Sequence, residues 1–412
     1  MKIRNLLKQQ LLDIFSMKKT YMDKETFIPY GKQYISKDDV SAVIKILKSN
    51  YLTQGDQVPK FEKSLSNFLK VNYSIAVNSG TSALHIACLA LGLTKGDYLW
   101  TSPISFVASA NCGRYCNAEI DFIDIDLKTG LLDVHLLSEK LKKAELKGKL
   151  PKIIVCVHLG GTSCDMKSIK KLSEKFGFKV IEDASHTFGG TYFEGKVGDC
   201  KYSDICVFSF HPVKIITTAE GGLATTNSKV LAEKMELLRT HYITKDPSKF
   251  ELINFGNWSY EQQGLGFNYR MNDIQAALGL SQLKRISSII EERNKILNTY
   301  KNNINDPNIS FLKIDKNIKS AVHLVIVIFN NISEENHKKL FNEMRQRNIG
   351  VQLHYSPIHL QPYYRKLGFK KGDYPKSEEY SRKALSLPVF EGLKDAQQKY
   401  VVKSLLDIFY NL

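Results

Sequence analysis

The sequence predicts an α/β protein in which a doubly wound, mostly parallel sheet forms a large domain and a smaller α/β domain follows it. Between residues 74 and 226, short apolar runs alternate with helix-like stretches, which is the pattern of a sheet whose strands are connected by helices. After residue 272 a long helical pattern breaks this alternation. The chain has 412 residues, 43% of them hydrophobic, so it is long enough to build two cores.

Each predicted strand is a short apolar run, because strands buried on both faces of a parallel sheet are apolar almost throughout. The helices are predicted from the segments between these runs and from the tail. Strands are expected at 74–78, 98–102, 120–125, 152–158, 178–182, 205–210, 223–226, 321–329 and 350–353, and helices at 81–92, 104–116, 135–145, 166–177, 334–347, 376–385 and 394–410.

One long helix over 272–302 is expected to connect the two domains. We therefore divide the chain into an N-terminal extension (1–27), a large domain (28–285) and a small C-terminal domain (286–412). The extension has basic residues and an apolar stripe, but polar residues interrupt the stripe and no small-residue cleavage site follows it. We interpret this segment as a loosely attached extension, or as a sign that translation starts at Met17 or Met22. A peripheral membrane helix is the alternative.

Composition argues against several classes of partner. No run approaches the ~18–20 apolar residues that span a bilayer, so stable membrane insertion is not expected. The formal net charge is +16, but lysines and acidic residues are interleaved along the whole chain, which argues against a nucleic-acid partner. We interpret the excess charge as attraction for anionic ligands such as a nucleoside diphosphate.

Seven cysteines in mostly apolar contexts are typical of reduced thiols in a cytoplasmic protein. Cys112 and Cys116 lie one helical turn apart and could be two metal ligands. No second pair at zinc-like spacing accompanies them, so no metal site is expected.

Two segments carry the chemistry. In SFHPVKIITTAEGG (209–222), Lys214 lies between an apolar strand and a turn rich in threonine and glycine. Such an amine can form a Schiff base with an aldehyde cofactor once its surroundings lower its pKa. In FKVIEDASHTFGG (178–190), a buried strand ends in Asp183. A pyridoxal phosphate enzyme needs this pair, because a carboxylate keeps the pyridinium nitrogen charged while a lysine holds the aldehyde. Alone, each residue has a plainer interpretation, as a solvated lysine and a helix cap.

The motif NSGTSAL (78–84) follows a predicted strand and opens a predicted helix. Gly80 permits close approach of the backbone, and the amides and hydroxyls of Thr81 and Ser82 make an anion site at the helix N-terminus. An ordinary capping turn would use the same residues.

Five motifs occur in one order along the chain: NSGTSAL (78–84), TSPISFVASAN (101–111), EDASHTFGG (182–190), SFHPVKIITTAEGG (209–222) and GFNYRMNDIQAALGLSQL (266–283). In this order they resemble the DegT/DnrJ/EryC1/StrS family of sugar-nucleotide aminotransferases, and the similarity extends from about residue 28 to about residue 407. Within the family, the branch of pseudaminic acid synthesis is more similar than the perosamine or aminoarabinose branches. The resemblance implies the type I fold of pyridoxal phosphate aminotransferases and pyridoxal 5'-phosphate as the cofactor.

The resemblance also implies roles at the cofactor. The turn at 80–82 and the hydroxyl of Ser209 would hold its phosphate. Phe106, an aromatic residue that would ordinarily be assigned to a core, would stack on the pyridine ring. His186 would reach the phenolic oxygen of the ring.

Other implied contacts lie further from the cofactor. Asn268 would reach the phosphate in the partner subunit, which implies an obligatory homodimer with shared sites. Thr53, Arg270, His354 and Tyr355 fall in segments that resemble the substrate-side loops of the family.

The implied reaction moves an amino group from glutamate to C4 of a UDP-linked 4-keto-6-deoxy-N-acetylhexosamine, with Lys214 as general base and acid. A nucleotide-sugar aminotransferase of the bacillosamine or perosamine type stays an alternative. A dehydratase of the same fold would carry histidine in place of Lys214, and a non-catalytic regulator would have lost Lys214 or Asp183. One departure stands out. The turn HLGGTSCDM (158–166) lacks a tyrosine that family members often carry, and we expect this to widen the pocket or alter sugar selection.

Overall fold

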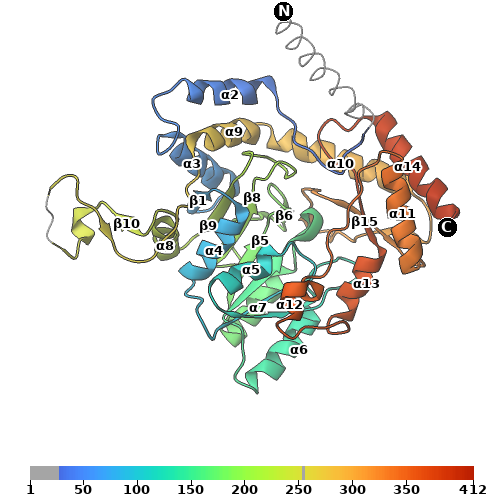
Figure 1. The fold of residues 1–412 in the computed structure, drawn as a ribbon, viewed down its shortest axis with the longest axis horizontal. Helices are drawn as coiled ribbons and strands as arrows, with labels where there is room; N and C mark the ends of the chain where they lie inside the picture. Colours follow the sequence, from blue (N-terminus) through green and yellow to red (C-terminus); the bar gives the residue numbers. More distant parts are fainter. Residues whose placement is uncertain (1–26, 253–255) are drawn as a thin grey trace, which may run out of the picture.

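The structure is a computed structural model that describes residues 27–252 and 256–412, so nearly all of the predicted extension 1–27 lies outside the described residues. A seven-stranded sheet forms the centre of the large domain (Figure 1), in the order β1-β9-β8-β5-β4-β2-β3. Every strand except β9 runs in the same direction, since β9 pairs antiparallel with both of its neighbours. The strands are β1 (Tyr73–Val77), β2 (Tyr98–Thr101), β3 (Glu119–Phe122), β4 (Ile153–Val157), β5 (Lys179–Asp183), β8 (Ile205–Ser209) and β9 (Gly222–Thr226).

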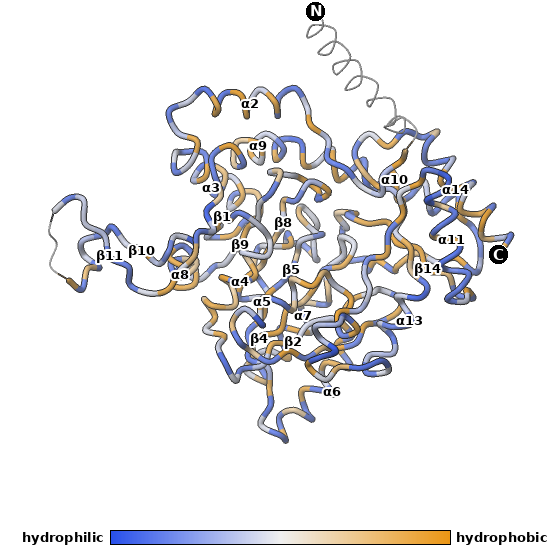
Figure 2. Tube along the Cα trace, in the orientation of Figure 1, coloured by the Kyte–Doolittle hydropathy of each residue, from blue (hydrophilic) through white to orange (hydrophobic). Residues whose placement is uncertain are grey.

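Helices cover both faces of this sheet because its strands are apolar on both sides. One face packs against α4 (Gly80–Ala90), α5 (Ala108–Tyr115) and α8 (Lys229–Arg239). The other face packs against α6 (Val134–Glu145) and α7 (Met166–Phe176) at one end, and α3 (Gln57–Leu69) and α9 (Asp273–Leu283) at the other. In Figure 2 the central strands and α4 are among the most hydrophobic segments. The predicted α/β class and the seven predicted strands of the large domain are confirmed, with boundaries that differ by up to a few residues.

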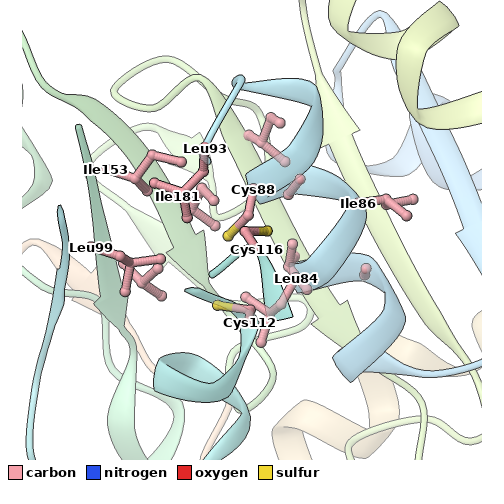
Figure 3. Packing of buried hydrophobic residues seen from close by; sticks show 14 of the residues in the cluster. Leu84, Ile86, Cys88, Leu93, Leu99, Cys112, Cys116, Ile153 and Ile181 are labelled. Atoms are coloured by element: carbon pink, nitrogen blue, oxygen red, sulfur yellow. The ribbon is translucent and has the colours of Figure 1, made fainter. Parts of the chain in front are cut away.

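Cys88, Cys112 and Cys116 lie in the apolar core beneath α4 and α5 (Figure 3), packed with Leu84 and Leu99. All seven cysteines are buried and none forms a disulfide. Among the described residues, no group of three or more potential ligands is arranged to hold a metal ion.

The predicted single helix over 272–302 was wrong. Two helices, α9 and α10 (Ile286–Asn303), meet at Arg285, whose backbone leaves helical geometry at φ −112° and ψ 16°. The guanidinium of Arg285 bonds Glu391 on one side and the buried carboxylate of Asp39 on the other. Asp39 belongs to α2 (Lys37–Leu47), which lies across α9 in Figure 1. The break between α9 and α10 therefore lies where one side chain makes long-range contacts, and the sequence pattern does not indicate it.

A second core and a three-stranded antiparallel sheet, in the order β12-β14-β15, make up the small domain. Its strands are β12 (Ile309–Phe311), β14 (Val325–Phe329) and β15 (Ala384–Leu387), and its helices are α11 (Glu334–Gln346), α12 (Pro362–Arg365), α13 (Pro375–Lys383) and α14 (Asp395–Tyr410). The second core includes Ile28, whose backbone bonds Asn348 and Gly350, so the start of the described chain packs with the small domain.

The strand predicted at 350–353 was wrong. Gln352 makes only an isolated bridge to Ser386, because the chain leaves β15 at once and turns toward the large domain. The helix predicted over 376–385 ends at Lys383, and the residues that follow form β15 instead.

A hairpin built on β10 (Ile243–Thr244) and β11 (Glu261–Gln262) projects from the body next to α8 (Figure 1). We refer to residues 240–252 and 256–266 as the arm. No helix in the described part of the chain is both long enough and apolar enough to cross a bilayer.

Candidate active site

A cavity of about 690 Å³ lies where the carboxyl ends of β1, β4, β5 and β8 meet the small domain. Parallel strands present their carboxyl ends at one edge of the sheet, which is where ligands bind in open α/β folds. The large domain contributes Lys214, Asp183 and His186 to the wall, and the small domain closes it with the segment 352–356. The fold therefore brings together residues that are far apart in the sequence.

Lys214 lies in the loop after β8 and is half-buried in the cavity wall. Among the described residues, no hydrogen bond or ion pair holds its Nζ atom. Burial lowers the pKa of Lys214 to about 8, although the negative charge of Asp183 opposes the shift. A substantial neutral fraction at physiological pH is what a nucleophilic amine requires.

Asp183 ends β5 and is buried at the base of the cavity. Its Oδ1 atom accepts hydrogen bonds from the Ser185 hydroxyl at 2.6 Å and the Ser185 backbone N–H at 3.2 Å. Its Oδ2 atom accepts a hydrogen bond from the Ser109 hydroxyl at 2.6 Å. The carboxylate is thus held from two elements and faces the same cavity as Lys214.

His186 is a neutral imidazole with a defined hydrogen-bond direction. Burial and the nearby positive charge of Lys214 hold its pKa well below the ordinary value. Its Nδ1 atom accepts from the backbone N–H of Gly160 at 3.3 Å, so the ring proton is on Nε2 and is donated to the Tyr355 hydroxyl at 3.1 Å. The hydroxyl proton of Tyr355 is then free for a group in the cavity. Burial also lowers the pKa of His354, the neighbour of Tyr355, to about 3, so this ring is neutral too.

The N-terminus of α4 forms the opposite end of the cavity. Gly80 and Thr81 line it, and within the described part of the chain their backbone N–H groups have no partner. A Cβ atom on Gly80 would lie 3.0 Å from the Cβ atom of Ser209, so only glycine allows these two elements to approach without adjustment. Two free amides at a helix N-terminus and the Ser209 hydroxyl suit a phosphate.

Ser82 is not brought to the cavity. Its hydroxyl donates to Asn78 at 2.6 Å, and its backbone N–H donates to the capping hydroxyl of Ser79 at 3.1 Å. Both groups are used within the turn, so the anion site predicted for residues 80–82 is reduced to Gly80 and Thr81.

Phe106 lines the cavity and is 58% exposed, so it is not a core residue in this chain. Its ring lies 6.3 Å from that of Tyr355 on the small domain. A flat apolar face on the rim of a polar cavity is available for a ring system.

Three predicted residues lie outside this cavity. Thr53 is exposed in the loop before α3. Asn268 pairs through its backbone with Thr240 and accepts from the Asn78 amide at 3.5 Å, and Arg270 pairs through its backbone with Val77. Asn268 and Arg270 lie beside the edge strand β1.

The turn that lacks the family's tyrosine does not line the cavity, although its Gly160 N–H donates to His186 in the cavity wall. Gly160 has a left-handed φ of 69°, and a Cβ atom there would point toward Ile326 and the carbonyl of Leu324 in the small domain. Its neighbour Gly161 accepts hydrogen bonds from the Ala321 N–H and the Ser320 hydroxyl. A side chain on Gly160 would start between the two domains rather than in the cavity, and the expected effect of this departure on pocket width or sugar selection stays a prediction.

Sequence reasoning missed several polar groups at the site, among them Tyr30, Ser185 and His323 in the cavity wall and the buried Ser109 behind Asp183. Ser185 could have been found, because a serine two residues after an aspartate commonly bonds it. Tyr30, Ser109 and His323 carry no local signal, since each reaches the site from a distant part of the chain.

The cavity fits pyridoxal phosphate. It combines a desolvated lysine, a buried carboxylate with room for a cationic N–H donor, a helix N-terminus for the phosphate and an exposed aromatic ring between them. With the type I fold of the large domain, these features define a pyridoxal phosphate aminotransferase.

Comparisons with known proteins agree with this class. Residues 33–406 match the DegT/DnrJ/EryC1/StrS aminotransferase family. The chain is 34% identical to the UDP-4-amino-4,6-dideoxy-N-acetyl-beta-L-altrosamine transaminase of Campylobacter jejuni, over 92% of this chain and 97% of that protein. It is also 34% identical to the spore coat polysaccharide biosynthesis protein SpsC of Bacillus subtilis, over 93% and 97%. Among solved structures, Helicobacter pylori PseC, an aminotransferase involved in the biosynthesis of pseudoaminic acid, matches with a TM-score of 0.86 at 32% identity, over 94% of this chain and 100% of that one.

The chain belongs to the DegT/DnrJ/EryC1/StrS aminotransferase family and is a sugar aminotransferase that depends on pyridoxal phosphate.

Proposed function

We propose that this enzyme moves an amino group from glutamate to C4 of a UDP-linked 4-keto-6-deoxy-N-acetylhexosamine, as in pseudaminic acid synthesis. The observation that carries the chemistry is Lys214, an amine desolvated in the same cavity as the buried carboxylate of Asp183. The relative from Campylobacter jejuni, which its name describes as a UDP-sugar transaminase, supports the choice of substrate.

The cofactor, when bound, supplies an aldehyde and a ring that withdraws electrons from the reacting carbon. Gly80 and Thr81 would hold its phosphate with their backbone N–H groups, and Ser209 would add a hydroxyl donor. Asp183 would accept from the ring nitrogen and keep it charged. Phe106 would pack on one face of the ring.

Lys214 has two tasks, and both depend on its neutral form. Its Nζ atom would hold the aldehyde of the bound cofactor in the resting enzyme and, once free again, would take up the proton from Cα of the amino donor. A pKa of about 8 places the amine close to working pH, so that it can accept that proton and give it up again.

The acceptor sugar lies against the small-domain wall. His186, which is neutral, donates to Tyr355, so the Tyr355 hydroxyl points its own proton toward a cavity acceptor such as a sugar oxygen. Tyr30 and His354 pack together at a ring distance of 5.2 Å and add aromatic surface on the same side. The net charge of +16 favours capture of a substrate that carries a diphosphate.

We further propose a homodimer in which each chain completes the site of the other. The arm supports this, because it projects from the body and carries exposed apolar side chains, with Trp258 79% and Leu265 80% exposed. Asn268 and Arg270 follow the arm directly and lie outside the cavity of their own chain. The unpaired thiols of all seven cysteines are consistent with a cytoplasmic enzyme.

Purified enzyme with glutamate should be tested against UDP- and GDP-linked 4-keto-6-deoxy sugars, following 2-oxoglutarate release and the mass of the aminated sugar. We expect the UDP-linked N-acetylhexosamine to be preferred by at least about tenfold in kcat/KM, which corresponds to ~1.4 kcal/mol. A preference for the GDP sugar would contradict the proposed substrate and leave the aminotransferase class intact.

The matched control is Lys214→Ala. This variant should lose turnover and should no longer retain cofactor covalently after borohydride treatment. A reducible adduct that persists in the alanine variant would mean that another lysine is the nucleophile.

A further inference from the structure

The hydrogen bonds around Asp183 leave a single acceptor direction open. An ionised carboxylate has about four lone-pair directions, two on each oxygen. Oδ1 already accepts two hydrogen bonds from Ser185, through its N–H at 3.2 Å and its hydroxyl at 2.6 Å. Oδ2 accepts only one, from Ser109 at 2.6 Å. Three of the four directions are therefore filled by the protein, and the remaining one belongs to Oδ2.

The carboxylate also sets the direction of the hydroxyl protons behind it. Ser109 must donate to Asp183, because an ionised carboxylate only accepts. The oxygen of Ser109 then accepts from Ser105, whose hydroxyl lies 2.6 Å away. Ser105 lines the cavity, so its lone pairs remain available there. The result is a chain of polarised hydrogen bonds, each of which strengthens the next.

We propose that Ser109 and Ser185 are positioning residues that hold the Asp183 carboxylate oriented with one free acceptor direction, on Oδ2, for the pyridinium N–H of the cofactor. The proposal rests on the proposed role of Asp183 at the ring nitrogen. It goes further, because it assigns the orientation of that carboxylate to two serines that touch neither the cofactor's phosphate site nor Lys214.

The two serines act from different elements and differ in access to water. Ser109 is at the start of α5 and is fully buried, so water cannot take the place of its hydroxyl. Ser185 follows β5 and is partly accessible at the cavity wall. With Ser109 truncated, the inner side of Oδ2 loses its donor in a buried setting, so the carboxylate turns toward other donors. This rotation moves the acceptor away from the position that a cationic ring nitrogen needs.

The test is the affinity of the cofactor-free full-length chain for pyridoxal phosphate, measured by fluorescence titration without any sugar. We expect the dissociation constant to rise about tenfold or more in Ser109→Ala, because a charge-assisted hydrogen bond no longer orients the acceptor. Ser185→Ala should show a smaller rise, and Ser185→Thr, which keeps the hydroxyl, should restore the wild-type value. Ser163→Ala is the matched control, since Ser163 is equally buried but donates to the Cys164 carbonyl away from this cavity.

A second readout separates positioning from packing. In Ser109→Ala, the pH at which lysine-bound cofactor loses its yellow absorbance should move upward. The ring then carries less positive charge, so it repels the proton on the lysine nitrogen more weakly and the pKa of that nitrogen rises. The serine substitutions should also have no further effect on cofactor affinity in an Asp183→Asn background.

Two outcomes would overturn the inference. One is cofactor affinity that stays unchanged in both alanine variants. The other is a loss of affinity that is just as large when Asp183 is already asparagine, because the serines would then act on the fold. If Ser109→Ala does not fold, as judged by its melting curve, the Ser185→Ala and Ser185→Thr pair decides. Wild-type protein that fails to bind pyridoxal phosphate would instead refute the assignment of the cofactor site itself.

Discussion

At the scale of a single residue, Lys214 shows that a catalytic side chain can lower the stability of the folded protein. The fold takes its ammonium group out of water, and the opposing charge of Asp183 offsets this only in part. Burial lowers the pKa of Lys214 from its ordinary value of 10.5 to about 8. Since the folded state then binds its proton less tightly than the unfolded chain, the lysine destabilises the cofactor-free protein.

The sign and the pH window follow from these two values. Below pH 8 the full cost is present, on the order of 3 kcal/mol, and it disappears as the pH rises toward 10.5, where both states lose the proton. Lys214→Met should therefore stabilise the cofactor-free enzyme by on the order of 2–3 kcal/mol at pH 7 and hardly at all near pH 10.5. Urea unfolding at the two pH values measures this. Lys147→Met, at an exposed lysine, is the control and should be neutral at both. Equal stability of Lys214→Met and wild type at pH 7 would show that the ammonium is solvated after all.

At the scale of secondary-structure elements, one arginine connects three segments of the chain. Arg285 lies between α9 and α10, donates twice to Glu391 at 2.5 and 2.6 Å, and donates to Asp39 at 3.1 Å. Asp39 is fully buried at the N-terminus of α2, where it also completes a capping box with Ser36. The junction therefore joins the N-terminal helix, the interdomain helices and a loop of the small domain.

Arg285→Ala should lower the free energy of unfolding by about 2–4 kcal/mol, because it leaves the buried carboxylate of Asp39 without its counter-charge. Arg347→Ala is the matched control. Arg347 pairs with Asp407 at an exposed position, so its loss should change stability by less than about 0.5–1 kcal/mol. Denaturant unfolding of the three proteins compares them directly. If both variants lose the same amount, the buried junction is no more important than a surface ion pair.

At the scale of the whole molecule, the proposed homodimer gives a role to the arm and to the residues that follow it. The cavity of one chain contains the lysine, the carboxylate and most of the phosphate donors, yet Asn268, Arg270 and Thr53 lie outside it. In the proposed homodimer the two chains exchange these residues. A site shared in this way makes the dimer necessary for activity.

Mixing two inactive variants tests the exchange. Lys214→Ala removes the amine, and Asn268→Trp blocks the position inferred to reach the partner's phosphate. If the two residues serve different sites, one site of a mixed dimer carries neither lesion, so we expect activity to return on mixing, up to about one quarter of the wild-type value with statistical exchange. Turnover after mixing, with each variant alone as the control, is the measurement. Failure of the mixture, once exchange of chains is established, would mean that Asn268 acts within its own chain.

The sequence by itself determined the class of fold and the reactive pair. Short apolar runs predict buried strands because a parallel sheet excludes polar residues from both faces, and all seven runs of the large domain are strands. Lys214 and Asp183 were predicted at strand ends, and that edge of the sheet is where the structure puts the cavity.

Only the tertiary structure decided the features that depend on long-range contacts. The break at Arg285, the short β15 and the irregular segment at 350–353 arise where side chains or backbone meet partners far away in the sequence, which local periodicity does not record. Ser109 reaches Asp183 across 74 positions, and Ser82 turns inward to Asn78. Whether a polar side chain faces a ligand or a neighbour depends on which donors the fold brings within about 3 Å, and this is fixed by packing rather than by the residue type.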